Sequence, residues 1–541
     1  MSDPKALNVE GEMKTQDVHH RLEVSHISWF HVKAILVAGV GFFTDAYDLC
    51  IISIIKPILG ILYYPQFNGK LPQAADLWLT GVALAGTLLG QVFFGILGDK
   101  LGRKTVYLFT LLLMITATIG QALSAQPLHG VLYLDYVWRI IVGLGCVPAV
   151  LTIYLRNKLP ETPRFTADVI KDTAKAEQDM DYVTQNVGRD WKQEAVATPM
   201  KQQDRITWRK LHHYLTYPDI LHNRNIWVLI GTCTTWFLLD IAFYSQILFL
   251  PNVLTAINYN PSIKLPNAAW YKANPEQYPD SMFVGRPANV TITIYLGNTP
   301  KCVGACAVAV FEKSYKTAAG NAIVAMMGTV PGYWFTIGLV DFMGRVTIQT
   351  MGFALMTILL IILASAYNHI VHVSKWLFIV LYALTFFFAN FGPNTTTFIT
   401  PVELFNTKFR STLHGFSAAS GKAGAIVGAF AIGKLFLDTK ISLQTTLAIL
   451  AATNFVGLIC TMFIPETKHL PLDVASSQTQ SMFAKLLAKR GIRQVDPESV
   501  ALVADAHGGT NGDVGDGAKP YSEPAAGEPA AAHDSNGLGS V

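Results

Sequence analysis

Three side chains that can bind an oxyanion follow one another at four-residue spacing near the middle of the 541-residue sequence. Trp236, Asp240 and Tyr244 would place an indole N–H, a carboxyl and a phenol on one stripe of one helix. A tetrahedral oxyanion accepts hydrogen bonds from several directions, and Trp and Tyr donate them without adding charge. A protonated oxyanion can also donate to a carboxylate. The stripe therefore predicts an oxyanion site. An aromatic stripe that packs two helices, with Asp240 in a polar network, is the alternative.

Two carboxylates lie three residues apart in an apolar run near the N-terminus. Asp45 and Asp48 would share nearly one face of a helix. Close carboxylates in a low dielectric repel each other, so one of them favours holding a proton. The pair predicts a proton relay, and simple solvation at a watery cavity mouth is the alternative.

Two more polar side chains interrupt apolar runs further along. Asn394 follows Pro393, which removes a backbone hydrogen bond and kinks a helix, so the amide can bond a ligand or the exposed backbone. A bend repaired by Thr395 and Thr397 is the alternative.

Lys422 lies among small residues that let helices approach closely. A buried ammonium there needs a carboxylate partner, and we expect Asp45 or Asp48 to supply it. A lysine that reaches the interface from near its helix end is the alternative.

The composition indicates a membrane protein. Hydrophobic residues make up 51% of the chain and charged residues 14%, the mean hydropathy is +0.34, and one polar surface cannot cover that much apolar residue. The net charge of +4 predicts no nucleic-acid partner. The sequence has no nucleotide-binding loop, metal-ligand set or nucleophile–base spacing, so we expect neither an enzyme nor a cofactor or metal.

Ten runs are long and apolar enough to cross a bilayer, which needs about 20 such residues. They lie near 33–58, 76–98, 104–124, 137–156, 226–250, 317–338, 346–366, 375–399, 411–435 and 443–464.

With a cytosolic N-terminus, ten alternating spans place the basic short loops and the basic loop 158–225 in the cytosol, as the positive-inside rule requires. The C-terminus is then cytosolic too. The loop 251–316 falls outside and contains the glycosylation pattern that begins at Asn289. The predicted organisation is a cytosolic segment 1–28, a four-span bundle 29–157, a cytosolic loop 158–225, a six-span bundle 226–466, and a cytosolic tail 467–541 that is disordered from about residue 505.

The two halves share two sequence markers in the same order. The first marker is a turn with an aspartate, a glycine and an arginine, in which glycine allows close approach and the charges can pair across helix ends. Its residues are Asp99, Gly102 and Arg103 in the first half, and Asp341, Gly344 and Arg345 in the second. The second marker is Pro-Glu-Thr, at 160–162 and 465–467. A duplicated plan of this kind is typical of transporters that rock two bundles around a site at the midplane.

The spacing between the markers is unequal. Asp99 and Glu161 are 62 residues apart, whereas Asp341 and Glu466 are 125 apart, a difference of 63 residues, or about two spans with their loops. If both halves descend from one six-span unit, the first half lacks its fourth and fifth spans. The position from which they are missing would then be 124–130.

The sequence resembles the major facilitator superfamily, and within it the fungal and plant proton-coupled inorganic phosphate symporters. The resemblance covers roughly residues 28–470. The matching strings lie at 41–49 on the first helix, at 236–244 on the seventh, at 391–398 on the tenth, and at 410–412 and 421–422 on the eleventh.

The resemblance implies an all-α, two-bundle membrane protein with about ten spans (four and six) instead of twelve. It implies import of inorganic phosphate with protons across the plasma membrane. It places Trp236, Asp240, Tyr244 and Asn394 at the phosphate, and it supports proton coupling through Asp45, Asp48 and Lys422. A motif on the family's fourth helix and a glutamine on its fifth have no match here, and the stretch 261–316 is longer than usual.

Two other functions stay open. A transport-inactive relative that senses phosphate or regulates partners is favoured by the missing spans. A carrier of another solute, such as a sugar or an organic anion, is the second alternative. The sequence does not predict an oligomeric state.

Overall fold

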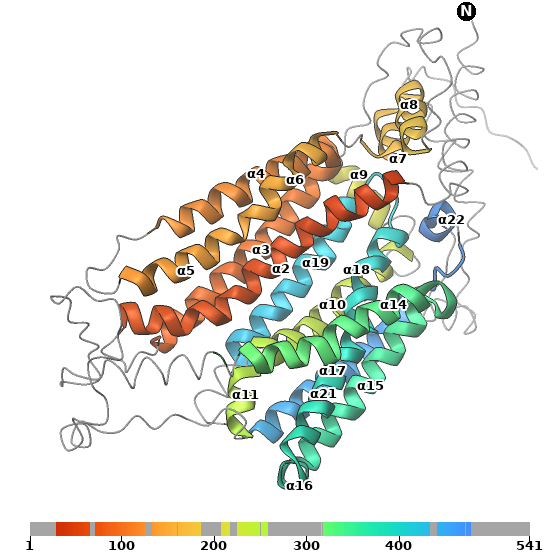
Figure 1. The fold of residues 1–541 in the computed structure, drawn as a ribbon. Helices are drawn as coiled ribbons and strands as arrows, with labels where there is room; N and C mark the ends of the chain where they lie inside the picture. The colour runs from red at the N-terminus through yellow and green to blue at the C-terminus, as the bar shows by residue number, and fades with distance from the viewer. Residues whose placement is uncertain are drawn as a thin grey trace, which may run out of the picture. The chain divides into compact units, whose positions relative to one another are not determined.

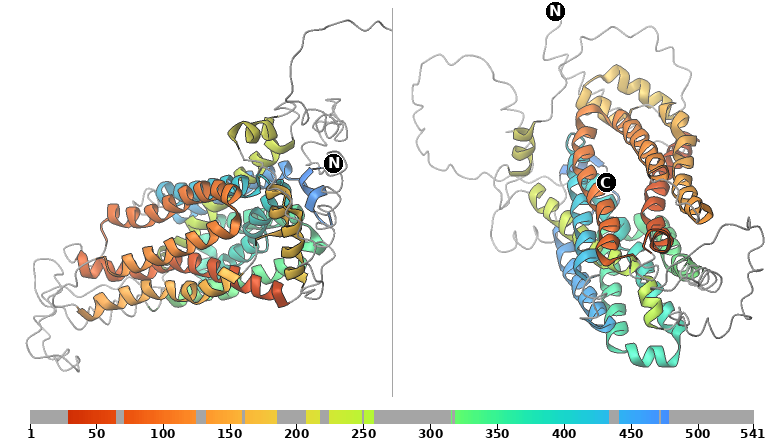
Figure 2. Two further views of the ribbon diagram at one scale, coloured as in Figure 1. Left: turned by 90° about the horizontal axis from the view of Figure 1, so that it is seen from above. Right: turned by 90° about the vertical axis from the view of Figure 1, so that its left-hand side faces the viewer.

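The computed structural model describes residues 29–64, 71–124, 132–158, 161–184, 207–216, 224–248, 250–257, 315, 318–432, 441–470 and 472–477. Throughout these ranges the chain forms helices and turns and no strand. The helices of each sequence half lie together, coloured red to orange and yellow-green to blue in Figures 1 and 2.

The first half forms one group of helices. They are α2 (Trp29–Tyr63), α3 (Gln73–Leu101), α4 (Arg103–Ala122), α5 (Leu132–Leu144) and α6 (Cys146–Lys158). The chain turns at Gly145 between α5 and α6, and these two form one candidate span over 136–153.

The second half forms the other group. It contains α10 (Arg224–Leu248), α11 (Leu250–Ala256), η6 (Ala325–Thr329), α14 (Val330–Met343), α15 (Arg345–Ser365), α16 (Tyr367–Val373), α17 (Lys375–Asn390), α18 (Pro393–Leu404), α19 (Arg410–Val427), η7 (Gly428–Ile432), α21 (Leu443–Cys460) and η8 (Thr461–Phe463).

Eight helices in the described residues are long and apolar enough to span a membrane, and they coincide with eight of the ten predicted runs. The remaining two runs are also helical: 33–58 lies in α2, and the described part of 411–435, up to residue 432, forms α19 and η7. These two carry the charged residues Asp45, Asp48 and Lys422. The all-helical multi-span class is confirmed, whereas the count of ten stays a prediction.

The first marker forms the same turn in both halves. Gly102 has φ +89° between α3 and α4, and Gly344 has φ +97° between α14 and α15. Residues other than glycine rarely adopt such φ values. We call the end of the molecule that carries both turns the glycine-turn end.

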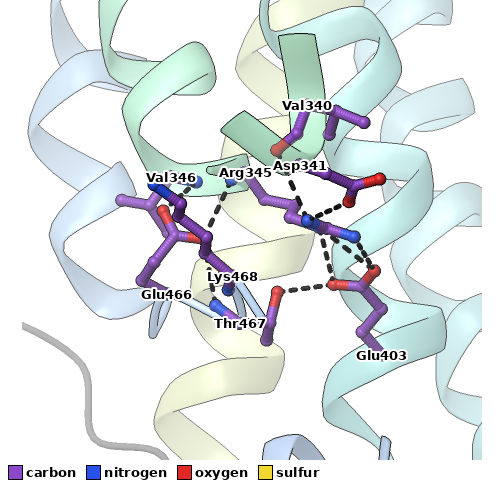
Figure 3. A network of polar contacts seen from close by, with 8 residues as sticks. All are labelled: Val340, Asp341, Arg345, Val346, Glu403, Glu466, Thr467 and Lys468. Atoms are coloured by element: carbon purple, nitrogen blue, oxygen red, sulfur yellow. Dashed lines mark hydrogen bonds and ion pairs between the residues drawn. The ribbon is translucent and has the colours of Figure 1, made fainter. Parts of the chain in front are cut away.

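The second marker caps the helix that follows each turn. The Glu161 carboxylate accepts a hydrogen bond from the Lys104 backbone N–H at 3.1 Å. In the second half the Glu466 carboxylate accepts from the N–H groups of Arg345 at 2.9 Å and Val346 at 3.0 Å (Figure 3). The first N–H groups of a helix lack partners inside the helix and carry partial positive charge. The two markers therefore act together, each glutamate stabilising the start of the third helix of its half.

The two halves meet most extensively along α3 and α19. A Cβ added at Gly95 would lie 3.2 Å from the Gly415 Cα atom, so the two backbones are in close contact. At the glycine-turn end the buried Asp99 carboxylate accepts from the N–H groups of Ser411 at 3.0 Å and Thr412 at 2.6 Å. Asp99 thus binds the N-terminus of α19 and holds the halves together at this end.

In its described residues, the segment predicted as a polar loop, 158–225, forms four short helices. They are α7 (Pro163–Phe165), η2 (Thr166–Ile170), α8 (Thr173–Thr184) and α9 (Trp208–Thr216). The Arg103 guanidinium lies over the Phe165 ring at 5.6 Å, which attaches the segment to the glycine-turn end. Burial raises the pKa of the Asp179 carboxyl, and a hydrogen bond from Thr166 at 3.0 Å opposes that shift.

The chain after the last span also packs at this end. Arg224, at the start of α10, donates to the carbonyl oxygens of Ala475 at 2.8 Å and Ser476 at 2.9 Å in α22 (Leu472–Ser477). A cation at the C-terminus of a helix is stabilising. Most of the predicted tail and the loop 258–314 lie outside the described residues, so the predicted segment boundaries stay predictions.

The positive φ at Gly102 gives a first prediction. Gly102→Ala should lower the free energy of unfolding by about 1–2 kcal/mol, because alanine disfavours this φ and its Cβ would lie 2.8 Å from a Glu161 oxygen. The measurement is the thermal unfolding midpoint of the purified chain. Gly120→Ala on the same α4 is the control, since its Cβ would meet no atom within 4 Å. Equal midpoints for the two variants would contradict the account of the turn.

Candidate functional site

A buried ion pair joins α10 to α19. The Lys422 ammonium lies 3.3 Å from the Asp240 carboxylate and donates to the Tyr244 hydroxyl at 2.5 Å. It also lies 4.3 Å from the centre of the Tyr244 ring. Asp240 is 1% exposed. In a low dielectric such a charge persists only with a close partner, and Lys422 is that partner, donating a hydrogen bond through the same contact.

Pairing of Lys422 with Asp45 or Asp48 stays a prediction, because the Asp45 side chain lies outside the described residues. The partner that the structure shows is Asp240. The physical reason is the packing of the small residues around it, because a Cβ at Gly421 would collide with the Trp236 ring on α10. The side of α19 that carries Gly421 and Gly424 therefore faces α10.

The two carboxylates of α2 stay a predicted proton relay. The Asp45 side chain lies outside the described residues. Asp48 lies against the break between α5 and α6, where a Cβ added at Gly145 would be 2.6 Å from its carboxylate. Beside it, Tyr47 donates to the Ile141 carbonyl at 2.6 Å.

Trp236 closes the site on the side of the glycine-turn end. Its ring is buried against Gly421 and meets His414 edge-on at 5.7 Å and Phe398 at 6.4 Å. Phe398 in turn contacts Phe42 of α2 at 5.3 Å. Trp236 packs helices together while Asp240 and Tyr244 hold the lysine, which is the arrangement that the alternative described. The oxyanion site stays a prediction.

Asn394 lies at a break in the fourth span of the second half. The helix stops at Asn390 and resumes at Pro393, as the proline predicted. The Asn394 amide donates to the Asn390 side-chain oxygen at 2.6 Å and to the Tyr333 hydroxyl at 2.9 Å. Thr395 donates to the freed Asn390 carbonyl at 2.7 Å, so the break is also repaired in the way that the alternative described.

Sequence reasoning missed Tyr333, on α14. It is bonded to Asn394 and lies within electrostatic range of Tyr244, Asp240 and Lys422. Four helices thus bring together one carboxylate, one ammonium, two phenols and an amide. The only signal in the sequence was a phenol two residues after Pro331 in an apolar run.

His414 was missed as well. It sits inside a predicted span, so the criterion that selected Asp45 and Lys422 also selects it. Its Nδ1 atom is buried and has no hydrogen-bond partner among the described residues. Its ring contacts the rings of Trp236 and Phe398, which lie near the residues around the ion pair. Within the same described residues no group of three metal-ligating side chains is present.

The turn of the second half binds a second carboxylate. Arg345 donates to Glu403 at the end of α18 at 2.9–3.1 Å and to Asp341 at 2.9 Å (Figure 3). The pairing of the aspartate and arginine of the marker is confirmed here, whereas Asp99 and Arg103 are 4.0 Å apart.

Most of the chain matches one protein family. The sequence pattern of the family described as "Sugar (and other) transporter" matches residues 34–146, 128–249 and 307–478.

Similar curated proteins are named as phosphate transporters. Inorganic phosphate transporter 1-2 of Oryza sativa subsp. japonica is 34% identical over 84% of this chain and 95% of its own length. Probable inorganic phosphate transporter 1-6 of Arabidopsis thaliana is 36% identical over 85% of this chain and 96% of its own. Among solved structures, the major facilitator superfamily proton:xylose symporter XylE aligns with a TM-score of 0.52 at 16% identity, over 82% of this chain and 98% of XylE, which supports the fold alone.

The ion pair gives a second prediction. Lys422→Met should lower the free energy of unfolding by about 3 kcal/mol or more, because it leaves the buried Asp240 charge uncompensated. The double variant Asp240→Asn with Lys422→Met should recover most of that loss. Thermal midpoints of the wild type, both single variants and the double variant complete the cycle. Additive losses would mean that the two residues are not coupled.

Proposed function

This chain belongs to the sugar (and other) transporter family of the major facilitator superfamily, and we propose that it carries inorganic phosphate across a membrane together with protons. The observation that carries the proposal is the buried Asp240–Lys422 pair with Tyr244, Tyr333 and Asn394 around it. The similarity to the rice and Arabidopsis transporters supports phosphate as the solute.

The donor set suits dihydrogen phosphate. Lys422 offers the one positive charge of the cluster, and the two phenols and the Asn394 amide donate hydrogen bonds without adding charge. Trp236 adds an indole N–H from the same helix as Asp240. The hydroxyls of dihydrogen phosphate need acceptors, which Asp240 can provide. The oxygens and the hydroxyl groups of the phosphate can then both have hydrogen-bond partners in a site of low dielectric.

Proton coupling follows from the charges of the pair. With Asp240 ionised, the lysine charge is already balanced and an entering anion gains little. When Asp240 takes up a proton, its carboxylate becomes a neutral carboxyl and the ammonium is free to balance one phosphate monoanion. One proton and one dihydrogen phosphate together are neutral, which limits the cost of crossing the apolar layer. Asp45 and Asp48 are proposed to exchange protons with this site.

The movement is proposed to be a rocking of the two halves about the site. The contact of Asp99 with the N-terminus of α19 supports a state closed at the glycine-turn end. Release of that contact would open the path past Trp236, Phe398 and His414. We propose that this end faces the cytosol, with both termini, in the plasma membrane.

A transport-inactive regulatory relative is the second candidate. It is favoured by one observation, the exposed and hydroxyl-bearing face of α14 beside the site, where Tyr333 is 40% exposed. A carrier whose solute site is open to lipid at its side would lose solute from the site or would not complete the transport cycle.

Uptake by the purified chain tests the proposal. Reconstituted vesicles should accumulate radiolabelled phosphate when the outside is acidic, and a protonophore should abolish accumulation. Asp240→Asn should abolish the dependence on the gradient, because the proton site is lost. A chain that binds phosphate but never accumulates it would favour the regulatory candidate.

Tyr333→Phe tests the donor set separately. Loss of one hydrogen bond to an anion should weaken the apparent phosphate affinity about tenfold. Trp334→Phe is the matched control, since Trp334 is exposed on the same helix. Unchanged affinity in Tyr333→Phe would remove α14 from the site.

A further inference from the structure

The short helix α9 has one packed face and one exposed face. Leu211 is 5% exposed, and Tyr214 and Leu215 pack beside it against a buried cluster around Phe405 and Phe409. The spacing of three and four residues puts these side chains on one side of the helix. The exposed side chains are Trp208, Arg209, Lys210, His212 and His213. α9 is therefore an amphipathic helix that contains two basic residues, two histidines and no acidic residue.

Contacts with α10 place α9 at the end of a span, beside the glycine turns (Figure 1). α10 is a candidate span that begins at Arg224, and the Asn225 amide donates to the Tyr214 carbonyl of α9 at 3.1 Å. Close by, Trp227 stacks on Phe463 at the end of the last span, with ring centres 5.7 Å apart. Tryptophan is enriched where spans meet the lipid headgroups. A helix fixed beside the first residues of a span lies at that level.

The exposed face of α9 complements an anionic lipid surface. Trp208 is 62% exposed, and an indole beside basic side chains is typical of helices that lie in the headgroup layer. Arg209 and Lys210 are the cations that anionic headgroups attract, and each such residue strengthens binding about fivefold. A neutral or zwitterionic lipid offers them no net charge. A second copy of this face would repel the first, because like charges would meet.

α9 also binds the loop that connects α18 to α19. The Tyr214 hydroxyl accepts from the Asn406 backbone N–H at 3.3 Å. The neighbouring Thr407 carbonyl accepts from Arg103 of the first half at 3.2 Å. The same loop leads into the N-terminus of α19, which Asp99 of the first half binds. The loop that α9 contacts is therefore the one through which the two halves are joined at this end.

We propose that the exposed face of α9, formed by Trp208, Arg209 and Lys210, binds anionic phospholipid headgroups of the leaflet at the glycine-turn end, and that this binding stabilises the closed contact between the halves. Headgroups that hold α9 in place also hold Tyr214 against the loop, and so favour the contacts of Arg103 and Asp99. The proposal concerns the membrane and stands whether or not phosphate is the solute.

Fluorescence quenching by labelled lipids tests the binding. The full chain, with its six cysteines replaced by serine, carries a bimane at His212→Cys, which is exposed one turn after Trp208. It is reconstituted in phosphatidylcholine vesicles that contain phosphatidylserine or phosphatidylcholine with a nitroxide close to the headgroup. Half-maximal quenching should need at least about fivefold less labelled phosphatidylserine than labelled phosphatidylcholine. High salt should reduce this preference.

Charge removal at and away from α9 supplies the control. The double variant Arg209→Gln with Lys210→Gln should abolish the preference for phosphatidylserine. The double variant Lys171→Gln with Lys175→Gln removes the same charge from exposed positions at and beside α8 and should keep it. Equal quenching by both lipids, or a preference that survives the α9 variant, would overturn the proposal. Absence of quenching by either lipid would do so too, because α9 would then lie in water and suit a protein partner.

Distances between spin labels test the effect on the halves. Nitroxides at Leu101→Cys, at the end of α3, and at Val402→Cys, on α18, report on the glycine-turn end from both halves, since both positions are exposed. The ratio of the short-distance to the long-distance population should rise several-fold when phosphatidylserine is added to phosphatidylcholine vesicles. Tyr214→Phe removes the hydroxyl that binds Asn406. It should reduce this rise and leave the lipid preference at residue 212 intact. Identical distance distributions in the two kinds of vesicle would refute the stabilisation of the closed contact.

Discussion

The structure depends on one constraint, that a charge inside an apolar layer must be balanced where it lies. Asp240 and Lys422 meet this constraint across α10 and α19, which makes the contact between these helices obligatory. The glycines beside Lys422 are needed for the same reason, since only a close helix pair lets a lysine reach the carboxylate. Under the proposed function this balance is also the coupling device, because a proton on one partner frees the other for an anion.

Backbone charge at helix ends obeys the same constraint. Glu161 and Glu466 bind the N–H groups that start α4 and α15, and Asp99 binds those that start α19. The contacts of Glu161 and Glu466 each lie within one half, where the second marker binds the helix that follows the first marker. The third joins the halves, so it is the one suited to break and re-form during transport. Carboxylates at helix N-termini thus build each bundle and also connect the two.

The sequence predicted the spans well because each carries its signal locally, in about 20 apolar residues. The markers likewise predicted the turns, since a positive φ at Gly102 needs glycine. Asp240 was not predicted as a partner of Lys422, because a partner depends on packing between distant segments, and local patterns do not say which face of α19 meets which helix. Tyr333 and His414 were missed for a related reason, as one phenol or imidazole in an apolar run looks like ordinary packing. The unequal marker spacing was visible in the sequence, whereas the difference in burial between the Asp99 side chain, 0% exposed, and the Asp341 side chain, 78% exposed, was not.

The central claim is that Asp240 takes up a proton when phosphate binds, so that phosphate replaces Asp240 as the partner of the Lys422 charge. Calorimetry of phosphate binding in buffers of different ionisation enthalpy tests it most directly, at an acidic pH where free phosphate is already the monoanion. The account predicts uptake of about one proton per bound phosphate in the wild type and none in Asp240→Asn. A binding enthalpy that is independent of the buffer in the wild type, or equal proton uptake in both proteins, would contradict it.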